Sequence, residues 1–208
     1  MDQPSSSTPH SILVRASAGG RGSVFTPSDF LDFAERPTVD QALSRLANNG
    51  KLRRLARGLY DLPKVHPRLG PLSPDPDNVA RALARETGSK VQIAGARAAH
   101  LLGLTAQVPA QSDYLTNGPS RRVVLGKRAI DLRHASRKHL ILPGSTAGTI
   151  VQALRHLGPT RADDIVRIAA RSLSAADKKK LAASVRQAPA WMRPTLLAIT
   201  AVQHVDER

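Results

Sequence analysis

The sequence predicts an α+β fold in two parts, a small N-terminal domain and a larger α+β domain with a helical C-terminal end. Segments with apolar residues at helical spacing alternate with short runs, bounded by turn signals, that suit β-strands. Five prolines lie between residues 63 and 77, a density that disfavours both helices and central strands. We therefore expect four segments: a disordered tail over 1–9, a first domain over 10–63, a proline-rich linker over 64–77 and a second domain over 78–208.

The charge of the chain points to an anionic partner. Its 208 residues include 31 Lys and Arg against 16 Asp and Glu, a formal net charge of +15, and such an excess is typical of nucleic-acid-binding proteins. Cysteine is absent, which excludes disulfides, thiolate metal sites and cysteine nucleophiles. No apolar run approaches the roughly 20 residues of a membrane span, and the N-terminus lacks the layout of a signal peptide. We expect a cytoplasmic protein with no membrane partner.

The first domain opens with short elements. Residues 12–14 begin a helix that Gly19-Gly20 stop, and residues 23–25 can form a brief strand. Thr26-Pro27-Ser28-Asp29 combines a capping residue, a proline at the first helical position and an acid in the first turn, so a second helix should start there. This helix is expected to bury Phe30, Leu31 and Phe33.

A third helix is predicted over 38–49, opened by the capping box Thr38-Val39-Asp40-Gln41 and stopped by Asn49-Gly50. Its apolar residues, at i, i+3, i+4 and i+7, are Val39, Ala42, Leu43 and Leu46. The opposite face carries side chains that can hydrogen bond to base edges: Gln41, Ser44, Arg45 and Asn48. Thr38 is expected to donate to a phosphate at the start of this helix.

A basic hairpin is predicted to follow over 51–62, with its turn at Ala56-Arg57-Gly58. Its expected phosphate contacts are Lys51, Arg53, Arg54 and Arg57. This order of elements predicts a winged helix-turn-helix DNA-binding domain, whose last helix enters the major groove while the hairpin contacts the backbone. The alternative is an ordinary solvated helix face beside a charged, solubilising edge strand. The lack of acidic residues between Asp40 and Asp61 disfavours that alternative.

The second domain mixes strands and helices. Helices are expected near 78–87 and 96–102, with strands at 91–93, 113–116, 121–125, 129–133 and 139–142. The C-terminal part is expected to be helical over 146–157, 162–172, 175–187 and 191–202.

A second basic cluster lies in the strand region 120–140. It comprises Arg121, Arg122, Lys127, Arg128, Arg133, Arg137 and Lys138, with Asp131 as the only acidic residue of the window. These cations could contact DNA, an acidic protein surface or RNA, or could simply be solvated. All four alternatives stay open at this point.

Several short motifs resemble the winged-helix domain of the AbiEi antitoxins, the DNA-binding members of bacterial type IV toxin–antitoxin pairs. The resemblance rests on Gly22-Ser-Val-Phe-Thr26, Asp29-Phe30, Ala42-Leu43-Ser-Arg-Leu46, Gly50-Lys-Leu52 and Arg57-Gly-Leu-Tyr60. The segment 95–104 and the basic strand region before a helical end are similar to the second domain of that family. The resemblance implies a repressor of its own operon, which could bind DNA as a homodimer, that neutralises a cognate nucleotidyltransferase-like toxin.

The sequence offers little for catalysis. Its histidines form no HExxH or i, i+4 pair, and there is no Walker loop, G-x-S-x-G or G-x-G-x-x-G. Asp177-Lys178-Lys179-Lys180 could be read as part of a nuclease motif, but a solvated helix face explains it better. We therefore expect no catalytic residues, metal or cofactor. The predicted function is an antitoxin and autorepressor that binds double-stranded operator DNA; the alternative is an RNA-binding or nuclease-like protein using 120–140.

Overall fold

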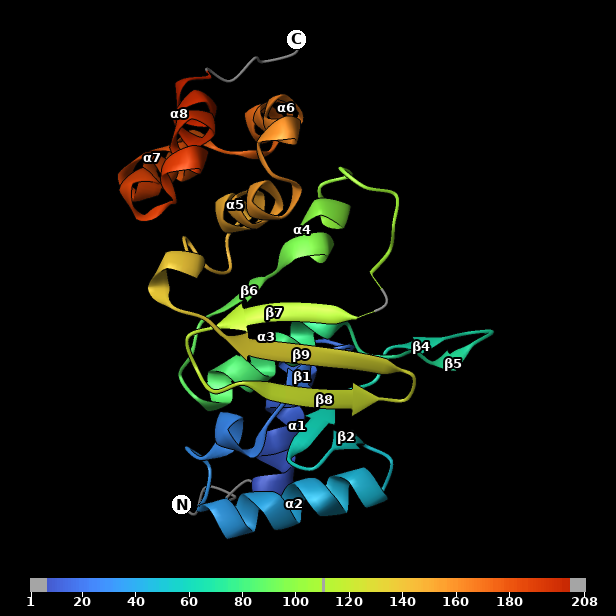
Figure 1. Ribbon diagram of the computed structural model, residues 1–208. Helices are drawn as coiled ribbons and strands as arrows, with labels where there is room; N and C mark the ends of the chain where they lie inside the picture. Colours follow the sequence, from blue (N-terminus) through green and yellow to red (C-terminus); the bar gives the residue numbers. More distant parts are fainter. Residues whose placement is uncertain (1–6, 110, 203–208) are drawn as a thin grey trace. The chain divides into compact units, whose positions relative to one another are not determined.

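Figure 1 shows the computed structural model of the chain, which describes residues 7–109 and 111–202. The fold is α+β with a helical C-terminal part, as the sequence predicts. The chain divides into two compact units. The first comprises the described residues through Ser89 together with Val123–Ile130, and the second comprises Lys90–Arg122 and the described residues from Asp131 onward.

The first unit packs helices on a small antiparallel sheet. Its elements begin with α1 (Thr8–Ala18), β1 (Val24–Phe25), the 3₁₀ helix η1 (Pro27–Phe30), α2 (Arg36–Asn48), β2 (Arg53–Ala56) and β3 (Leu59–Asp61). The strand order is β1-β3-β2, and both pairings are antiparallel. Helix α1 packs on α2, and their apolar faces enclose one core, formed mainly by Ile12, Phe25, Phe30, Val39, Leu43, Leu46, Leu52 and Tyr60.

Helix α1 begins at Thr8, inside the segment 1–9 that we predicted to be a tail. Pro9 lies in its first turn, where the missing N–H of proline costs no hydrogen bond, so the Pro-containing start of the chain is compatible with a helix. The rest of that predicted tail, residues 1–6, lies outside the described residues.

The capping signal at Thr26 produces a single 3₁₀ turn, η1, rather than a longer helix. The carboxylate of Asp29 accepts a hydrogen bond of 2.8 Å from the backbone N–H of Thr26, as the capping box requires. Phe30 is fully buried and Phe33 is partly buried, but Leu31 is exposed, so its predicted burial was wrong. One turn of helix presents too narrow a face to bury three side chains.

Helix α2 begins at Arg36, two residues before the start that we predicted at Thr38. Pro37 was expected to precede the helix, yet it occupies the first turn, where proline fits well. The N-cap is Glu35, and Thr38 therefore lies within the first turn. The helix ends at Asn48, and Gly50 follows with φ +67°, in agreement with the predicted stop.

The segment 64–77 is not a simple linker. It contains a short antiparallel hairpin, β4 (Val65–His66) and β5 (Gly70–Pro71), and the start of helix α3 (Pro76–Glu86). Helix α3 contacts β1 and η1, so it belongs to the first unit. The units separate after Ser89 instead of at the proline-rich segment. Pro71 lies at a strand end and Pro76 in the first turn of α3, and both positions tolerate proline.

The second unit combines a four-stranded sheet with helices. Its sheet has the order β6-β7-β9-β8, with the tip of the β8–β9 hairpin grouped with the first unit. The elements are β6 (Val91–Ile93), α4 (Gly95–Leu101), β7 (Ser112–Thr116), β8 (Arg121–Leu125), β9 (Arg128–His134), the 3₁₀ helix η2 (Arg137–His139), α5 (Thr146–Leu157), η3 (Pro159–Arg161), α6 (Ala162–Ser172), α7 (Ala175–Ser184), η4 (Val185–Gln187), η5 (Ala190–Met192) and α8 (Arg193–Ala201).

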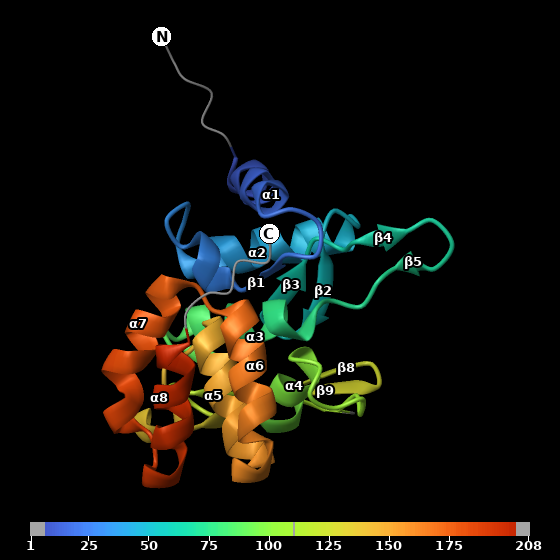
Figure 2. The ribbon, with the colours of Figure 1, turned by 90° about the horizontal axis from the view of Figure 1, so that it is seen from above.

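The C-terminal helices α5 to α8 pack side by side (Figure 2). Their shared core is formed mainly by Ile150, Val151, Leu154, Ile165, Leu181, Met192, Leu196 and Ile199. Among the described residues, no helix is long and apolar enough to cross a membrane.

The strand predicted at 139–142 is absent: residues 137–139 form η2, and those that follow are irregular. Leu142 has φ +48°, which is incompatible with an extended strand. Ile141 is nonetheless buried in the helical core, so its apolar character reflects packing rather than strand formation.

Candidate nucleic-acid interface

Helix α2 presents a polar face opposite its buried stripe. Thr38, Gln41, Arg45 and Asn48 are exposed and Ser44 is partly buried, whereas Val39, Leu43 and the other apolar residues of the helix are buried. The 3.6-residue period places all five polar residues on one side. The structure therefore brings these predicted site residues together on a single helix face.

Two acidic residues lie near the N-terminal end of α2, one at the N-cap and one in the second turn. Glu35 caps the helix, and Asp40 accepts hydrogen bonds from the Nε of Arg36 at 3.1 and 3.2 Å. The carboxylate of Glu35 opposes a phosphate at the helix N-terminus, where Thr38 was expected to act, whereas the charge of Asp40 is offset by Arg36. Arg45 and Asn48, nearer the C-terminal end, lie away from them.

The β2–β3 hairpin follows α2 directly, and Gly58 at its turn has φ +68°, a conformation that favours glycine. Lys51, Arg54 and Arg57 are exposed, as expected of groups that hold phosphates. A register shift between Arg54 and Ala56 bends β2 within this short hairpin.

Arg53 differs from its neighbours. Its Nε and Nη2 donate to the two carboxylate oxygens of Asp61 at 3.0 and 2.5 Å, and Nη2 also donates to the carbonyl of Leu72 at 2.8 Å. Asp61 is fully buried and lies directly opposite Arg53 in the β2–β3 register. The guanidinium of Arg53 is thus used inside the first unit, and its predicted role as a phosphate contact is corrected to a structural one.

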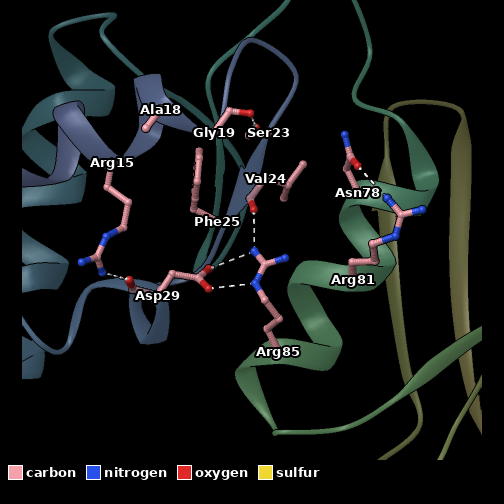
Figure 3. Close-up of a pocket in the computed structure, with 10 residues that line it drawn as sticks. All are labelled: Arg15, Ala18, Gly19, Ser23, Val24, Phe25, Asp29, Asn78, Arg81 and Arg85. Carbon is pink, nitrogen blue, oxygen red and sulfur yellow. Dashed lines mark hydrogen bonds and ion pairs between the residues drawn. The ribbon is translucent and has the colours of Figure 1, made fainter. Parts of the chain in front are cut away.

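Side chains of helix α3 form hydrogen bonds to the segment that contains β1 and η1 (Figure 3). Arg85 donates to both carboxylate oxygens of Asp29, at 3.0 and 3.3 Å, and to the carbonyl of Val24 at 2.9 Å. The amide of Asn78 donates to the carbonyl of Gly22 at 3.0 Å. An open cavity of about 600 Å³ is lined in part by Val24, Asp29, Asn78 and Arg85, and the polar groups of its lining largely form hydrogen bonds with one another. The arrangement fixes β1 and η1, the elements that precede α2, rather than offering a ligand site.

The β4–β5 hairpin adds exposed cations that the sequence prediction left out of the site. It extends from the rest of the first unit in Figure 2 and exposes Lys64 and Arg68, together with the apolar side chains of Val65 and Leu69. Both cations were visible in the sequence, but the surrounding prolines favoured a linker over a hairpin.

Two members of the second basic cluster form ion pairs with carboxylates. Asp131 pairs with Arg122 at 3.6 Å, and Asp113 pairs with Arg133 at 2.5 Å. Arg133 donates to the carboxylate of Asp113, and this hydrogen bond raises the pKa of Arg133. Asp113 lies outside the 120–140 window, so the charge count of that window missed it. Of the remaining members, Arg121 lies on β8, Lys127 and Arg128 at the β8–β9 turn, and Arg137 and Lys138 on η2 beside a different cavity.

Within the described residues, no group of three or more His, Cys, Asp or Glu side chains is arranged to hold a metal ion. The site is therefore defined by exposed cations and amides: the polar face of α2 next to a basic hairpin, within a small α+β unit.

Comparison with known proteins assigns the chain to a family. The family model matches residues 12–181, most of the chain, and this protein therefore belongs to DUF6088, a family of unknown function. No curated protein matches. Among solved structures, the chain is similar to the crystal structure of the RV2827C protein from Mycobacterium tuberculosis, at 18% identity and a TM-score of 0.44, covering 99% of this chain and 87% of that one.

Proposed function

We propose that this protein is a sequence-specific double-stranded-DNA-binding repressor whose first unit is a winged helix-turn-helix. The observation that carries the proposal is the exposed polar face of α2, with Gln41, Arg45 and Asn48, directly followed by a hairpin with exposed Arg54 and Arg57. The order α1, β1, η1, α2, β2, β3 supports it, because three helical segments before a hairpin are the elements of a winged helix.

The two surfaces play different parts in this proposal. Arg and Asn side chains can make paired hydrogen bonds to guanine and adenine in the major groove, so α2 reads the sequence. The cations of the hairpin neutralise phosphates and provide affinity without sequence information. Neither surface requires a cofactor or a catalytic group.

The AbiEi resemblance extends the proposal to an antitoxin in the cytoplasm. In that case the protein represses its own operon, as a homodimer where the operator is symmetric, and its second unit neutralises a nucleotidyltransferase-like toxin. The support is the set of motifs in the first unit, above all Arg57-Gly-Leu-Tyr60 in the β2–β3 hairpin.

The DNA part is tested by fluorescence anisotropy with the full chain at about 150 mM salt. The probes are duplexes tiling the chain's own promoter region, a scrambled duplex of equal length, and a single-stranded RNA of the same sequence. We expect one promoter duplex to bind at least about 10³-fold more tightly than the scrambled duplex. Equal affinity for all duplexes, or tighter binding of the RNA, would contradict the proposal.

The antitoxin part is tested separately. The gene beside this one should encode a nucleotidyltransferase-like protein that arrests growth when expressed alone, and co-expression of this chain should restore growth. Growth arrest that this chain does not relieve would remove the antitoxin role and leave the repressor role intact.

A further inference from the structure

The second unit contains a cationic cavity that lies outside the α2 interface. It has a volume of about 640 Å³ and lies among η2, α5, η4, the loop residues Ala188 and Pro189, and the start of α8. Its basic lining residues are Arg137, Lys138, His139, Arg155, Arg186 and Arg193. The other described lining residues are Gln187, Ala188 and Pro189, so no carboxylate among them offsets five permanent positive charges.

Two of the arginines are held in place by backbone carbonyls. Arg193 donates through Nε to Ala188 at 3.0 Å and through Nη2 to Arg186 at 3.3 Å. Arg155 donates through Nη2 to Lys138 at 3.1 Å. Carbonyl oxygens orient a guanidinium without neutralising its charge, so these contacts position cations for an anionic ligand instead of substituting for one.

In the part of the chain that the structure describes, Arg155 lacks a compensating negative charge and a hydrogen-bond acceptor for one of its nitrogen atoms. Its Nε is buried and has no hydrogen-bond partner among the described residues. Burial also lowers the pKa of Arg155, because no nearby carboxylate compensates for the lost hydration of its charge. Arg155 lines the cavity, and an anion bound there would supply the countercharge that this desolvated guanidinium lacks among the described residues.

We propose that this cavity binds a small anion that carries several phosphate groups. Its volume is in the range of small-molecule sites, and its charge exceeds what a single phosphate, with at most two negative charges, would neutralise. Arginine side chains suit phosphate oxygens because of their paired donors. No aromatic side chain is among the described lining residues, so recognition rests on the phosphates and not on stacking of a base.

A nucleic-acid backbone is the competing occupant. A phosphodiester carries only one charge per phosphate, and its neighbours along a duplex are spread over an extended surface, whereas these cations converge on one cavity. The observations therefore favour a compact polyphosphate over a duplex.

The test is isothermal titration of the full chain with tripolyphosphate at about 150 mM salt, which screens non-specific attraction. We expect one site per chain with a dissociation constant of about 1–100 μM. Arg155→Gln and Arg186→Gln should each weaken binding by about tenfold or more. Arg155→Lys, which keeps the charge but replaces the planar guanidinium and its paired donors with an ammonium group, should also weaken binding. Arg171→Gln removes an exposed arginine of the same unit outside this cavity and should leave binding unchanged.

Three results would overturn the proposal. These are a dissociation constant above about 1 mM, equal effects of Arg171→Gln and Arg186→Gln, or displacement of tripolyphosphate by a random duplex at equal phosphate concentration. If Arg155→Gln does not fold, Arg186→Gln and Arg137→Gln decide the question, because the side chains of Arg186 and Arg137 are not needed to hold the described elements together. The titration does not involve promoter binding by α2, so a failure leaves the proposed repressor function untouched.

Discussion

At the scale of single residues, Arg53 and Arg54 show that adjacent cations of one strand can have opposite uses. Alternate residues of a strand point to opposite faces, so one arginine meets buried Asp61 while the next is exposed. The sequence predicted both as phosphate contacts, because the isolated Asp61 gave no indication of its partner. The register of the hairpin, which depends on the turn at Gly58, decides the pairing.

This difference gives a prediction about stability. Arg53→Ala leaves the carboxylate of Asp61 buried without its partner and should lower the free energy of unfolding by about 3–5 kcal/mol. Arg54→Ala is the matched control, and it should change stability by less than about 0.5 kcal/mol. Urea unfolding monitored by circular dichroism measures both. Similar stabilities of the two variants would show that the Arg53–Asp61 pair contributes little.

A second residue-scale prediction concerns Arg45, which is exposed on the polar face of α2 in its last turn. Arg45→Ala should weaken binding to the promoter duplex by about 1–3 kcal/mol. The affinity for the scrambled duplex should change little, because a contact to a base edge contributes only where the correct base is present. Anisotropy titrations with both duplexes measure the ratio of the two affinities. Equal losses of affinity for the two duplexes would identify Arg45 as a phosphate contact instead.

At the scale of elements, hydrophobic spacing predicted most helices and strands, but the positions of prolines led to wrong predictions of where helices start. Pro37 and Pro76 each occupy the first turn of a helix, although their sequence surroundings place them outside one. The apolar run 139–142 suggests a strand that the backbone of Leu142 does not permit. A local sequence pattern does not distinguish a proline that starts a helix from one that precedes it, or a buried loop from a short strand.

The exposed arginines of the β2–β3 hairpin should contact the phosphates of bound DNA. The double variant Arg54→Ala and Arg57→Ala should weaken binding to promoter and scrambled duplexes alike and reduce the slope of log affinity against log salt by about two, roughly one for each arginine removed from a phosphate. Lys179→Ala, an exposed lysine on α7 in the second unit, serves as the control and should leave the slope unchanged. An unchanged slope in the double variant would remove this hairpin from the DNA interface.

At the scale of the whole molecule, the division of the chain was the least predictable feature. Composition placed a boundary in the proline-rich segment, but α3 begins at the end of that segment, continues past it and still belongs to the first unit. The contacts responsible join residues 56 to 61 positions apart, through Asn78 to Gly22 and Arg85 to Asp29 and Val24. Neither Asn nor Arg at the surface of a helix signals such a distant partner in the sequence.

The position of α3 leads to a prediction about fragments. A fragment of residues 1–89 should unfold cooperatively on heating and retain binding to the promoter duplex, although it lacks Val123–Ile130. A fragment of residues 1–70 loses α3 and leaves the carbonyls of Gly22 and Val24 without these donors, so its melting temperature should be lower by several degrees or its transition lost. The Arg85→Ala variant of the longer fragment should have a melting temperature between those of the two fragments. It loses the hydrogen bonds of Arg85 but keeps the packing of α3 on β1.

Circular dichroism melts, followed by anisotropy with the promoter duplex, separate the outcomes. If residues 1–70 melt at the same temperature as residues 1–89 and bind DNA equally well, then α3 is dispensable for the first unit, and the proline-rich segment is the functional boundary after all.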